Sequence, residues 1–327
     1  MKNIKLNSLL AFIFLFFIYG NQNIFEWNSF TSLINPSSVI KDSNDDMVAA
    51  TSGGLLLLSN NELHILKDNL NNLNLSIIGL DNYGLIWIGG ASPNGNIQVL
   101  DNNYNLIYDS SYLGIKSVTE FIFSDNSVFV IYNNENDIGI LEFNYDNGVP
   151  YYVDYYNSFP ETITSISDID LFNEYLYITT DQGIFNANII NDNLKLSTSW
   201  NNFLDNTGEF DSDILFFHRN DIGTYLITQQ NLYLNQESIL SFNSDPFDIL
   251  SNDENSTFCN KSNCYKIDNS SHFLYSISEY NINNFYRYDN HLFFCIKNGG
   301  LMSLDLNNYN RDHYIPNTIL QNRYDAL

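Results

Sequence analysis

The stretch Gly79–Gly90, with the sequence GLDNYGLIWIGG, shows most clearly how the chain is built. A polar turn from Asp81 to Gly84 is followed by the apolar run Leu85–Ile88 and then by two glycines. Asp and Asn favour tight turns, whereas branched and aromatic residues favour strands. The stretch therefore predicts a hairpin turn, one buried strand and a second tight turn.

The same order of turn, apolar strand and turn recurs along the chain. Seven segments align as the apolar strand: Met47–Thr51, Leu85–Gly89, Val128–Tyr132, Tyr175–Thr180, Thr224–Thr228, Ser256–Cys259 and Leu292–Ile296. Turn glycines follow five of them: Gly54, Gly95, Gly139, Gly183 and Gly300. The spacing is roughly 40 residues, which together with short strands is the signature of β-propeller blades.

We therefore predict an all-β, seven-bladed β-propeller over residues 21–315. Packing blades around a ring covers the faces that one four-stranded sheet would leave exposed. An eight-bladed ring, or the first of two propellers, is the alternative. It arises because residues 316–327 fit either a closing tail or the start of a further repeat in a truncated chain. Ile24–Phe30 is predicted to close the ring as an outer strand on the last blade.

Residues 1–20 have the pattern of a signal peptide. Lys2 and Lys5 precede the apolar run Leu9–Tyr19, and Gly20 offers a small residue for cleavage. The apolar run is about half as long as a membrane-spanning helix, so we expect no membrane span, with an uncleaved anchor as the alternative. The protein is thus predicted to be exported, to the periplasm, the cell surface or the extracellular space.

The charge of the chain excludes one class of partner. It has 13 basic and 38 acidic residues, for a net charge of −25. Such a surface repels the phosphates of nucleic acid and anionic lipid, so we expect no nucleic acid partner. The same charge favours a soluble monomer.

The repeat is similar to that of a known family. Four residues fall on the repeat of the two-component regulator propeller family: Asp81, Gly84, Trp87 and Gly89. Three other turns resemble it more loosely: Thr51–Leu55, Thr180–Ile184 and Asn298–Leu301. A signal peptide followed by a strand from Trp27 to Phe30 also resembles the N-terminal propeller of PorZ-like proteins of the type IX secretion system.

The resemblance implies an exported, non-enzymatic module that binds or assembles a glycan or protein ligand at the bacterial cell envelope. Some members of these families carry a C-terminal sorting domain, and others are periplasmic sensor halves of hybrid histidine kinases that detect glycans. The sensor part of a truncated histidine kinase is therefore one alternative function. An enzyme that acts on polysaccharide is another.

Ligands of propellers usually bind the face formed by two sets of loops, those between second and third strands and those between blades. Nine residues are candidates for ligand binding on this face: Ser92, Asn94, Asn133, Asn134, Glu135, Asp137, Asp205, Glu209 and Asp211. Their amide, hydroxyl and carboxylate groups can hydrogen-bond to a sugar or a peptide. A nearby cluster fits either a platform for stacking a sugar or the outer strand of a blade: Tyr151, Tyr152, Tyr155 and Tyr156.

The sequence predicts no catalytic residue, no metal site and no cofactor, since no nucleophile elbow or His-x-His pair occurs. Asp168 and Asp170 lie two apart on a predicted strand, a spacing that resembles the paired carboxylates of glycosidases, but a solvated strand face is the favoured interpretation. Asp42–Asp46 spaces its oxygens like a calcium loop. Met47 stands where such a loop needs Gly, which favours a hairpin turn.

The three cysteines divide into a pair and a single residue. Cys259 and Cys264 flank a short turn between two strand-like stretches. In an oxidising compartment they fit a cross-hairpin disulfide, with two free thiols as the alternative. Cys295 lies in an apolar run and is predicted to be a buried thiol.

Overall fold

A computed structural model describes residues 32–134, 137–160, 162–205, 210, 213–252, 255–268 and 270–317. All of them belong to the compact unit Thr31–Leu327. The predicted signal peptide, the predicted closing strand Ile24–Phe30 and the tail beyond residue 317 lie outside the described residues.

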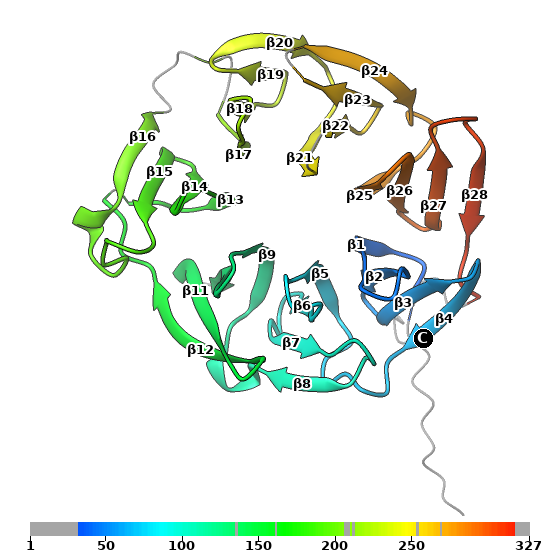
Figure 1. Cartoon of the computed structure of the whole chain (residues 1–327), viewed down its shortest axis with the longest axis horizontal. Helices are drawn as coiled ribbons and strands as arrows, with labels where there is room; N and C mark the ends of the chain where they lie inside the picture. Colours follow the sequence, from blue (N-terminus) through cyan, green and yellow to red (C-terminus); the bar gives the residue numbers. More distant parts are fainter. Residues whose placement is uncertain are drawn as a thin grey trace, which may run out of the picture. The chain divides into compact units, whose positions relative to one another are not determined.

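The described unit is a seven-bladed β-propeller, as predicted. Seven antiparallel sheets of four strands each are arranged as a ring (Figure 1). In every blade the strands follow one another in chain order, and the first strand lies nearest the centre (Figure 1). In the described ranges the helices are two three-residue 3-10 turns, Ser111–Leu113 and Ser197–Ser199. Neither of these helices is long enough to cross a membrane.

The first four blades have the following strands. Blade 1 contains β1 (Pro36–Lys41), β2 (Met47–Thr51), β3 (Gly54–Ser59) and β4 (Glu62–Leu66). Blade 2 contains β5 (Leu75–Leu80), β6 (Ile86–Gly90), β7 (Ile97–Leu100) and β8 (Leu106–Asp109). Blade 3 contains β9 (Ser117–Phe123), β10 (Ser127–Asn134), β11 (Asp137–Asp146) and β12 (Val149–Tyr156). Blade 4 contains β13 (Ile166–Phe172), β14 (Tyr175–Thr180), β15 (Gly183–Asn188) and β16 (Asn201–Asp205).

The other three blades complete the ring. Blade 5 contains β17 (Phe216–Arg219), β18 (Thr224–Ile227), β19 (Asn231–Leu234) and β20 (Glu237–Ser241). Blade 6 contains β21 (Pro246–Asn252), β22 (Asn255–Asn260), β23 (Asn263–Ile267) and β24 (Ser271–Ser276). Blade 7 contains β25 (Ile282–Tyr288), β26 (His291–Ile296), β27 (Gly300–Asp305) and β28 (Arg311–Tyr314). The seven segments predicted from the repeat all fall on the second strands of these blades, with small differences at their ends.

Blades 1 and 7 each take their four strands from consecutive residues and pack directly on one another. The N–H of Gly300 donates to the carbonyl of Ile34 over 3.0 Å, and Nδ2 of Asn283 donates to the carbonyl of Pro36 over 2.9 Å. A shared buried cluster joins Leu33 and Met47 to Cys295. Among the described residues the ring therefore closes by face-to-face packing of its first and last blades.

The innermost strands carry a repeated irregularity that joins neighbouring blades. A bulge interrupts the register of β1, β5 and β13 at their second residue, which is Ser37, Ser76 or Ser167. Oγ of Ser76 donates to the carbonyl of Val118 over 2.7 Å, and Oγ of Ser167 donates to the carbonyl of Leu215 over 2.7 Å. A bulge leaves its extra residue outside the ladder. In these strands it turns a hydroxyl toward the next blade.

A threonine hydroxyl closes the turn between the second and third strands in blade 4, which has a turn glycine, and in blade 5, which has none. In blade 4, the hydroxyl of Thr180 donates to the carbonyl of Gly183 over 2.8 Å. In blade 5 the hydroxyl of Thr228 donates to the carbonyl of Asn231 over 3.2 Å, so a side chain closes the turn in the same way. The prediction that Gly139 lies in such a turn is wrong, because Gly139 is inside β11.

Cys259 and Cys264 face each other on β22 and β23 and are joined by a disulfide with an S–S distance of 2.02 Å. Cys295 is a free, buried thiol in β26, as predicted, and burial raises its pKa.

Candidate functional site

Five of the nine candidate ligand-binding residues lie on the face formed by the turns between second and third strands and by the connections between blades, here called the interblade-loop face. Ser92 and Asn94 lie in the turn between β6 and β7. Asn133 and Asn134 end β10, and Asp137 begins β11, so these strands extend further into the predicted loop than the sequence suggested.

Three candidate residues lie outside the described residues: Glu135, Glu209 and Asp211. Asp205 was predicted to lie in a loop, but it is the last residue of β16, the outermost strand of blade 4. Propensity could not place this strand end, because Asn201–Asp205 has a composition that suits a loop as well as an edge strand.

The first of two hollows on this face, the blade 2 hollow, has a volume of about 460 Å³. Its lining is Asn71, Asn72, Pro93, Asn94, Gly95, Asn96, Ser111, Gly114, Ile115 and Lys116. A hydrogen-bonded frame holds these loops. Nδ2 of Asn72 donates to the carbonyl of Asn94 over 2.7 Å, and Nε2 of Gln98 donates to the carbonyl of Asn72 over 2.9 Å. The hollow is therefore formed by loops whose positions are fixed before any ligand arrives.

The second, the blade 3 hollow, has a volume of about 630 Å³. Its lining is Asn133, Asn134, Asp137, Ile138, Asn157, Ser158, Phe159, Thr162, Ile163 and Thr164. Asp137 accepts hydrogen bonds from the hydroxyl of Tyr132 over 3.0 Å and from Nδ2 of Asn157 over 3.0 Å. Burial raises the pKa of Tyr132, and the bond to Asp137 raises it further, so this hydroxyl stays a neutral donor.

The backbone of Lys116 joins the two hollows. Its N–H donates to Oδ1 of Asn134 over 2.9 Å, and its carbonyl accepts the N–H of Gly95 over 2.7 Å. A side chain at Gly95 would place its Cβ 2.3 Å from the backbone N of Ser117, so this close approach requires glycine. The hollows are thus neighbours on one continuous surface.

The turns between second and third strands, which the sequence indicated, supply four of the ten lining residues of each hollow, and the sequence did not indicate the other six. Asn72, Ile115, Asn157 and Thr162 come from the connections between blades, which carry no motif of their own. The topology alone points to them, because in a propeller these connections share a face with the turns between second and third strands. The lining side chains are mainly uncharged, and Lys116 and Asp137 are the two that carry a charge.

The predicted stacking residues lie elsewhere. The four tyrosines of the cluster all belong to β12, the outermost strand of blade 3, and none of them lines either hollow: Tyr151, Tyr152, Tyr155 and Tyr156. Tyr151 and Tyr155 are exposed, and Tyr156 is buried. This alternation is what an outer strand shows, the second of the two interpretations left open by the sequence.

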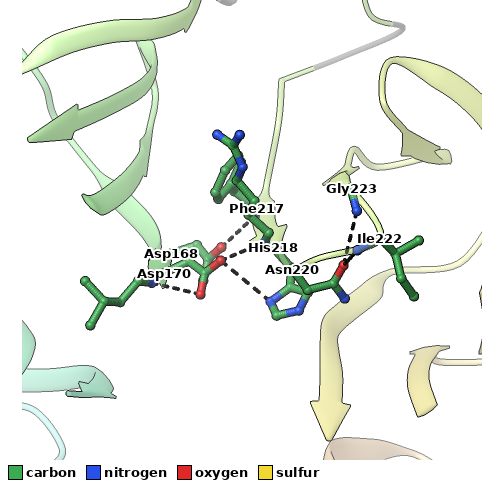
Figure 2. Close-up of polar contacts among 9 residues, drawn as sticks. Asp168, Asp170, Phe217, His218, Asn220, Ile222 and Gly223 are labelled. Carbon is green, nitrogen blue, oxygen red and sulfur yellow. Dashed lines mark hydrogen bonds and ion pairs between the residues drawn. The ribbon is translucent and has the colours of Figure 1, made fainter. Parts of the chain in front are cut away.

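The paired carboxylates Asp168 and Asp170 are buried, so the prediction that they form a solvated strand face is wrong. Figure 2 shows both carboxylates between β13 and β17, the innermost strands of blades 4 and 5. Oδ2 of Asp168 accepts the N–H of Phe217 over 2.6 Å, and Oδ2 of Asp170 accepts the N–H of Arg219 over 2.8 Å. These N–H groups lie on the inner edge of β17, and the two carboxylates satisfy them.

Burial shifts the pKa of Asp168, Asp170 and His218 at this contact. It raises the pKa of Asp168 to about 7 and also raises the pKa of Asp170. A hydrogen bond between Asp168 and Glu120 of β9 adds a third carboxyl group at this contact. Burial also lowers the pKa of His218, whose Nδ1 lies 3.6 Å from Oδ2 of Asp170. The pair therefore serves as an acceptor for backbone donors and does not open onto either hollow.

The segment with calcium-like spacing, Asp42–Asp46, is the turn between β1 and β2. Oδ1 of Asp42 accepts the N–H groups of Asn44 and Asp46, each over 2.9 Å. Its Oδ2 accepts the hydroxyl of Tyr104 over 2.6 Å. Among the described residues, no group of three or more His, Cys, Asp or Glu side chains is placed to hold a metal ion.

No family model and no curated protein sequence matches this chain. Solved structures that are similar to it include the following three. PorZ, an essential bacterial surface component of the type IX secretion system of Porphyromonas gingivalis, has a TM-score of 0.67 and 15% identity, over 89% of this chain and 39% of PorZ. Virginiamycin B lyase from Staphylococcus aureus with quinupristin has a TM-score of 0.62 and 12% identity, over 85% of this chain and 95% of the lyase. U3-55K has a TM-score of 0.60 and 10% identity, over 81% of this chain and 89% of U3-55K.

Identities this low show a shared propeller fold. The chain spans 39% of the length of PorZ. The fold is shared by a surface component of a secretion system and by an enzyme. The fold therefore does not decide between binding and catalysis, and that question depends on the residues of the site.

Proposed function

We propose that this protein is an exported, non-enzymatic propeller that binds a glycan of the bacterial cell envelope in the blade 2 and blade 3 hollows. One observation carries the proposal. The two adjoining hollows are lined mainly by amide groups, hydroxyl groups and backbone, on the face where propellers usually bind ligands.

The lining suits an uncharged sugar better than a charged ligand. Each sugar hydroxyl both donates and accepts a hydrogen bond, and Asn, Ser and Thr side chains offer the matching groups. Asn94 and Asn133 are exposed and available at the surface of the two hollows. Phe159 and Ile163 supply apolar surface for the C–H face of a sugar ring in the blade 3 hollow.

Export is supported by the signal-peptide pattern and by the cysteines. A disulfide between Cys259 and Cys264 persists in an oxidising compartment and is rare in the cytosol. The fold similarity to PorZ, a bacterial surface component, is in keeping with such a location.

A binding role is favoured over catalysis by the state of the acidic pair. The carboxylates Asp168 and Asp170 are buried between two strands and bonded to the backbone, so they are not placed to flank a glycosidic bond in either hollow.

The experiment is a screen of the purified protein against bacterial cell-envelope oligosaccharides, followed by calorimetric titration of a retained sugar. The double variant Asn94→Ala with Asn133→Ala removes one exposed amide from each hollow. We expect it to weaken binding about tenfold, since a lost hydrogen bond is worth about 0.5–1.5 kcal/mol.

The matched control changes two exposed amides in hairpin turns on the opposite face, Asn126→Ala with Asn290→Ala. It should bind like the unchanged protein. Retention of peptides and of no oligosaccharide would overturn the glycan assignment, and cleavage of a retained sugar would overturn the non-enzymatic one.

A further inference from the structure

A third hollow lies where the ring closes, on the face opposite the interblade loops. It has a volume of about 640 Å³ and is lined by residues of blades 1 and 7. Its walls include the turn between β1 and β2 and the turn between β27 and β28. We call it the closure hollow.

Two rows of side chains, one from each blade, form the closure hollow. On blade 7, Phe293, Ser303 and Asp312 lie side by side on three neighbouring strands. The strand register pairs Asp305 with His291 in the next row of the same sheet. On blade 1 the corresponding row is Lys41, Met47 and Leu58.

The floor and walls are apolar and aromatic. Met47 and Leu58 are buried, and Phe293 and Tyr314 are half-buried and also line the hollow. Such a surface suits the carbon chain of a ligand.

The rim is acidic, which distinguishes the closure hollow from the other two. Asp45, Asp46, Asp305 and Asp312 all contribute to its lining. The one lysine in the lining, Lys41, is already paired, with its Nζ 2.7 Å from Oδ1 of Asp45. The remaining carboxylates give the hollow a negative potential in a chain whose net charge is −25.

Lys41 also shows how the walls hold an ammonium group. Its Nζ lies 3.3 Å from the centre of the Tyr288 ring while it contacts Asp45. A carboxylate on one side and an aromatic face on the other is the usual arrangement for binding an organic cation. The hollow therefore contains, within the chain itself, one example of the contact that it can make with a ligand.

We propose that the closure hollow binds a primary alkylammonium group, with the charge beside Asp305 and Asp312 and the carbon chain against Phe293. The ligand is either a free aliphatic amine or a lysine side chain of another protein, which share this chemistry. The site is distinct from the glycan site of the preceding section and does not depend on it.

The test is a calorimetric titration of the full chain with 1,5-diaminopentane at low salt, compared with 1,5-pentanediol, an uncharged molecule of the same length. We expect the diamine to bind and the diol not to bind. The variant Asp305→Asn with Asp312→Asn should weaken diamine binding at least tenfold. Asn at 305 can still accept the N–H of Asn307, which Asp305 accepts over 2.8 Å.

The matched control is Asp125→Asn with Asp221→Asn, two exposed acids in hairpin turns on the same face. It changes the net charge by the same amount and should leave binding within twofold. Equal binding by the control and the site variant would overturn the proposal, because it would show that the diamine only screens the overall charge.

A second variant, Phe293→Leu, keeps the apolar volume and removes the aromatic face. It should weaken binding of the diamine several-fold, and unchanged binding by both this variant and the Asn variant would also contradict the proposal.

A titration with an Nα-blocked lysine amide distinguishes a free amine from a lysine side chain of another protein as the ligand. Binding as tight as that of the diamine supports a protein lysine, and binding of the diamine alone supports a free amine.

Discussion

Two contacts between blades each contain a buried aspartate but differ in the groups that it accepts. In the 2/3 seam, between blades 2 and 3, Oδ2 of Asp81 accepts the indole N–H of Trp87 over 2.8 Å and the hydroxyl of Tyr145 over 2.6 Å. In the 4/5 seam, between blades 4 and 5, Asp168 and Asp170 instead accept backbone N–H groups of β17.

The difference shows which structural roles leave a mark in the sequence. Oδ1 of Asp81 also accepts the N–H groups of Tyr83 and Leu85, over 2.9 and 2.8 Å, within its own turn. Gly84 completes that turn with a φ of 78°, a conformation that favours glycine. The partners of Asp81 in its own repeat, Tyr83, Leu85 and Trp87, lie close to it in the sequence, so together they form a recognisable motif. Phe217 and Glu120, the partners of Asp168, are on the two neighbouring blades, and no local sequence pattern records them.

The largest expected effect is at the 2/3 seam. Trp87 is fully buried and contacts the rings of Phe121, Phe143 and Tyr145. Replacing it with Ala should lower the free energy of unfolding by about 3–5 kcal/mol, measured by urea denaturation. Trp87→Phe should lose less, because it keeps an aromatic ring. An equal loss in both variants would show that the bond to Asp81, and not packing, dominates.

The 4/5 seam should show a smaller effect with a different chemical signature. Asp168→Ala leaves the buried N–H of Phe217 without its acceptor, which should cost about 1–3 kcal/mol. Asp168→Asn keeps an acceptor for that N–H and can donate to Glu120, so at a pH of about 4 its stability should stay close to that of the unchanged protein. If Asn costs as much as Ala, the backbone bond is not what Asp168 supplies.

The pH dependence of the free energy of unfolding gives a second comparison of Asp168→Asn with the unchanged protein. Burial raises the pKa of Asp168, so the native state keeps a proton that the unfolded chain has lost. The contribution of this proton to the free energy of unfolding is therefore fully present below a pH of about 4. It is lost as the pH rises toward and through the raised pKa of Asp168, by about 1.4 kcal/mol per pH unit. The advantage of Asp168→Asn over the unchanged protein should grow from pH 4 upward, as measured by denaturation at each pH. A constant difference would contradict a raised pKa. Glu120, Asp170 and His218 face the same point and are unchanged in both proteins.

The smallest effects should be equal at the two seams. Ser76→Ala and Ser167→Ala each remove one hydroxyl bond from an innermost strand to the next blade. Each should cost about 0.5–1.5 kcal/mol in the free energy of unfolding. A large effect in one variant and none in the other would show that the bulged serine is not a shared device for joining blades.

The sequence predicted the fold well because the repeat is local. Residues such as Trp87 and Thr180 belong to strands and turns whose bonding partners are near in the chain. The sequence misplaced Asp168, because a polar residue on a strand looks the same whether it faces solvent or the edge of the next blade. It could not assemble the hollows either, since Asn72 and Asn94 are brought together only by the packing of separate loops.

The most direct test of the proposed function is a crystal structure of the protein with the oligosaccharide that it retains most tightly. We predict the sugar in the blade 2 and blade 3 hollows, with hydrogen bonds to Asn94 or Asn133. A sugar bound at any other part of the ring would contradict the assignment of the interblade-loop face as the binding site.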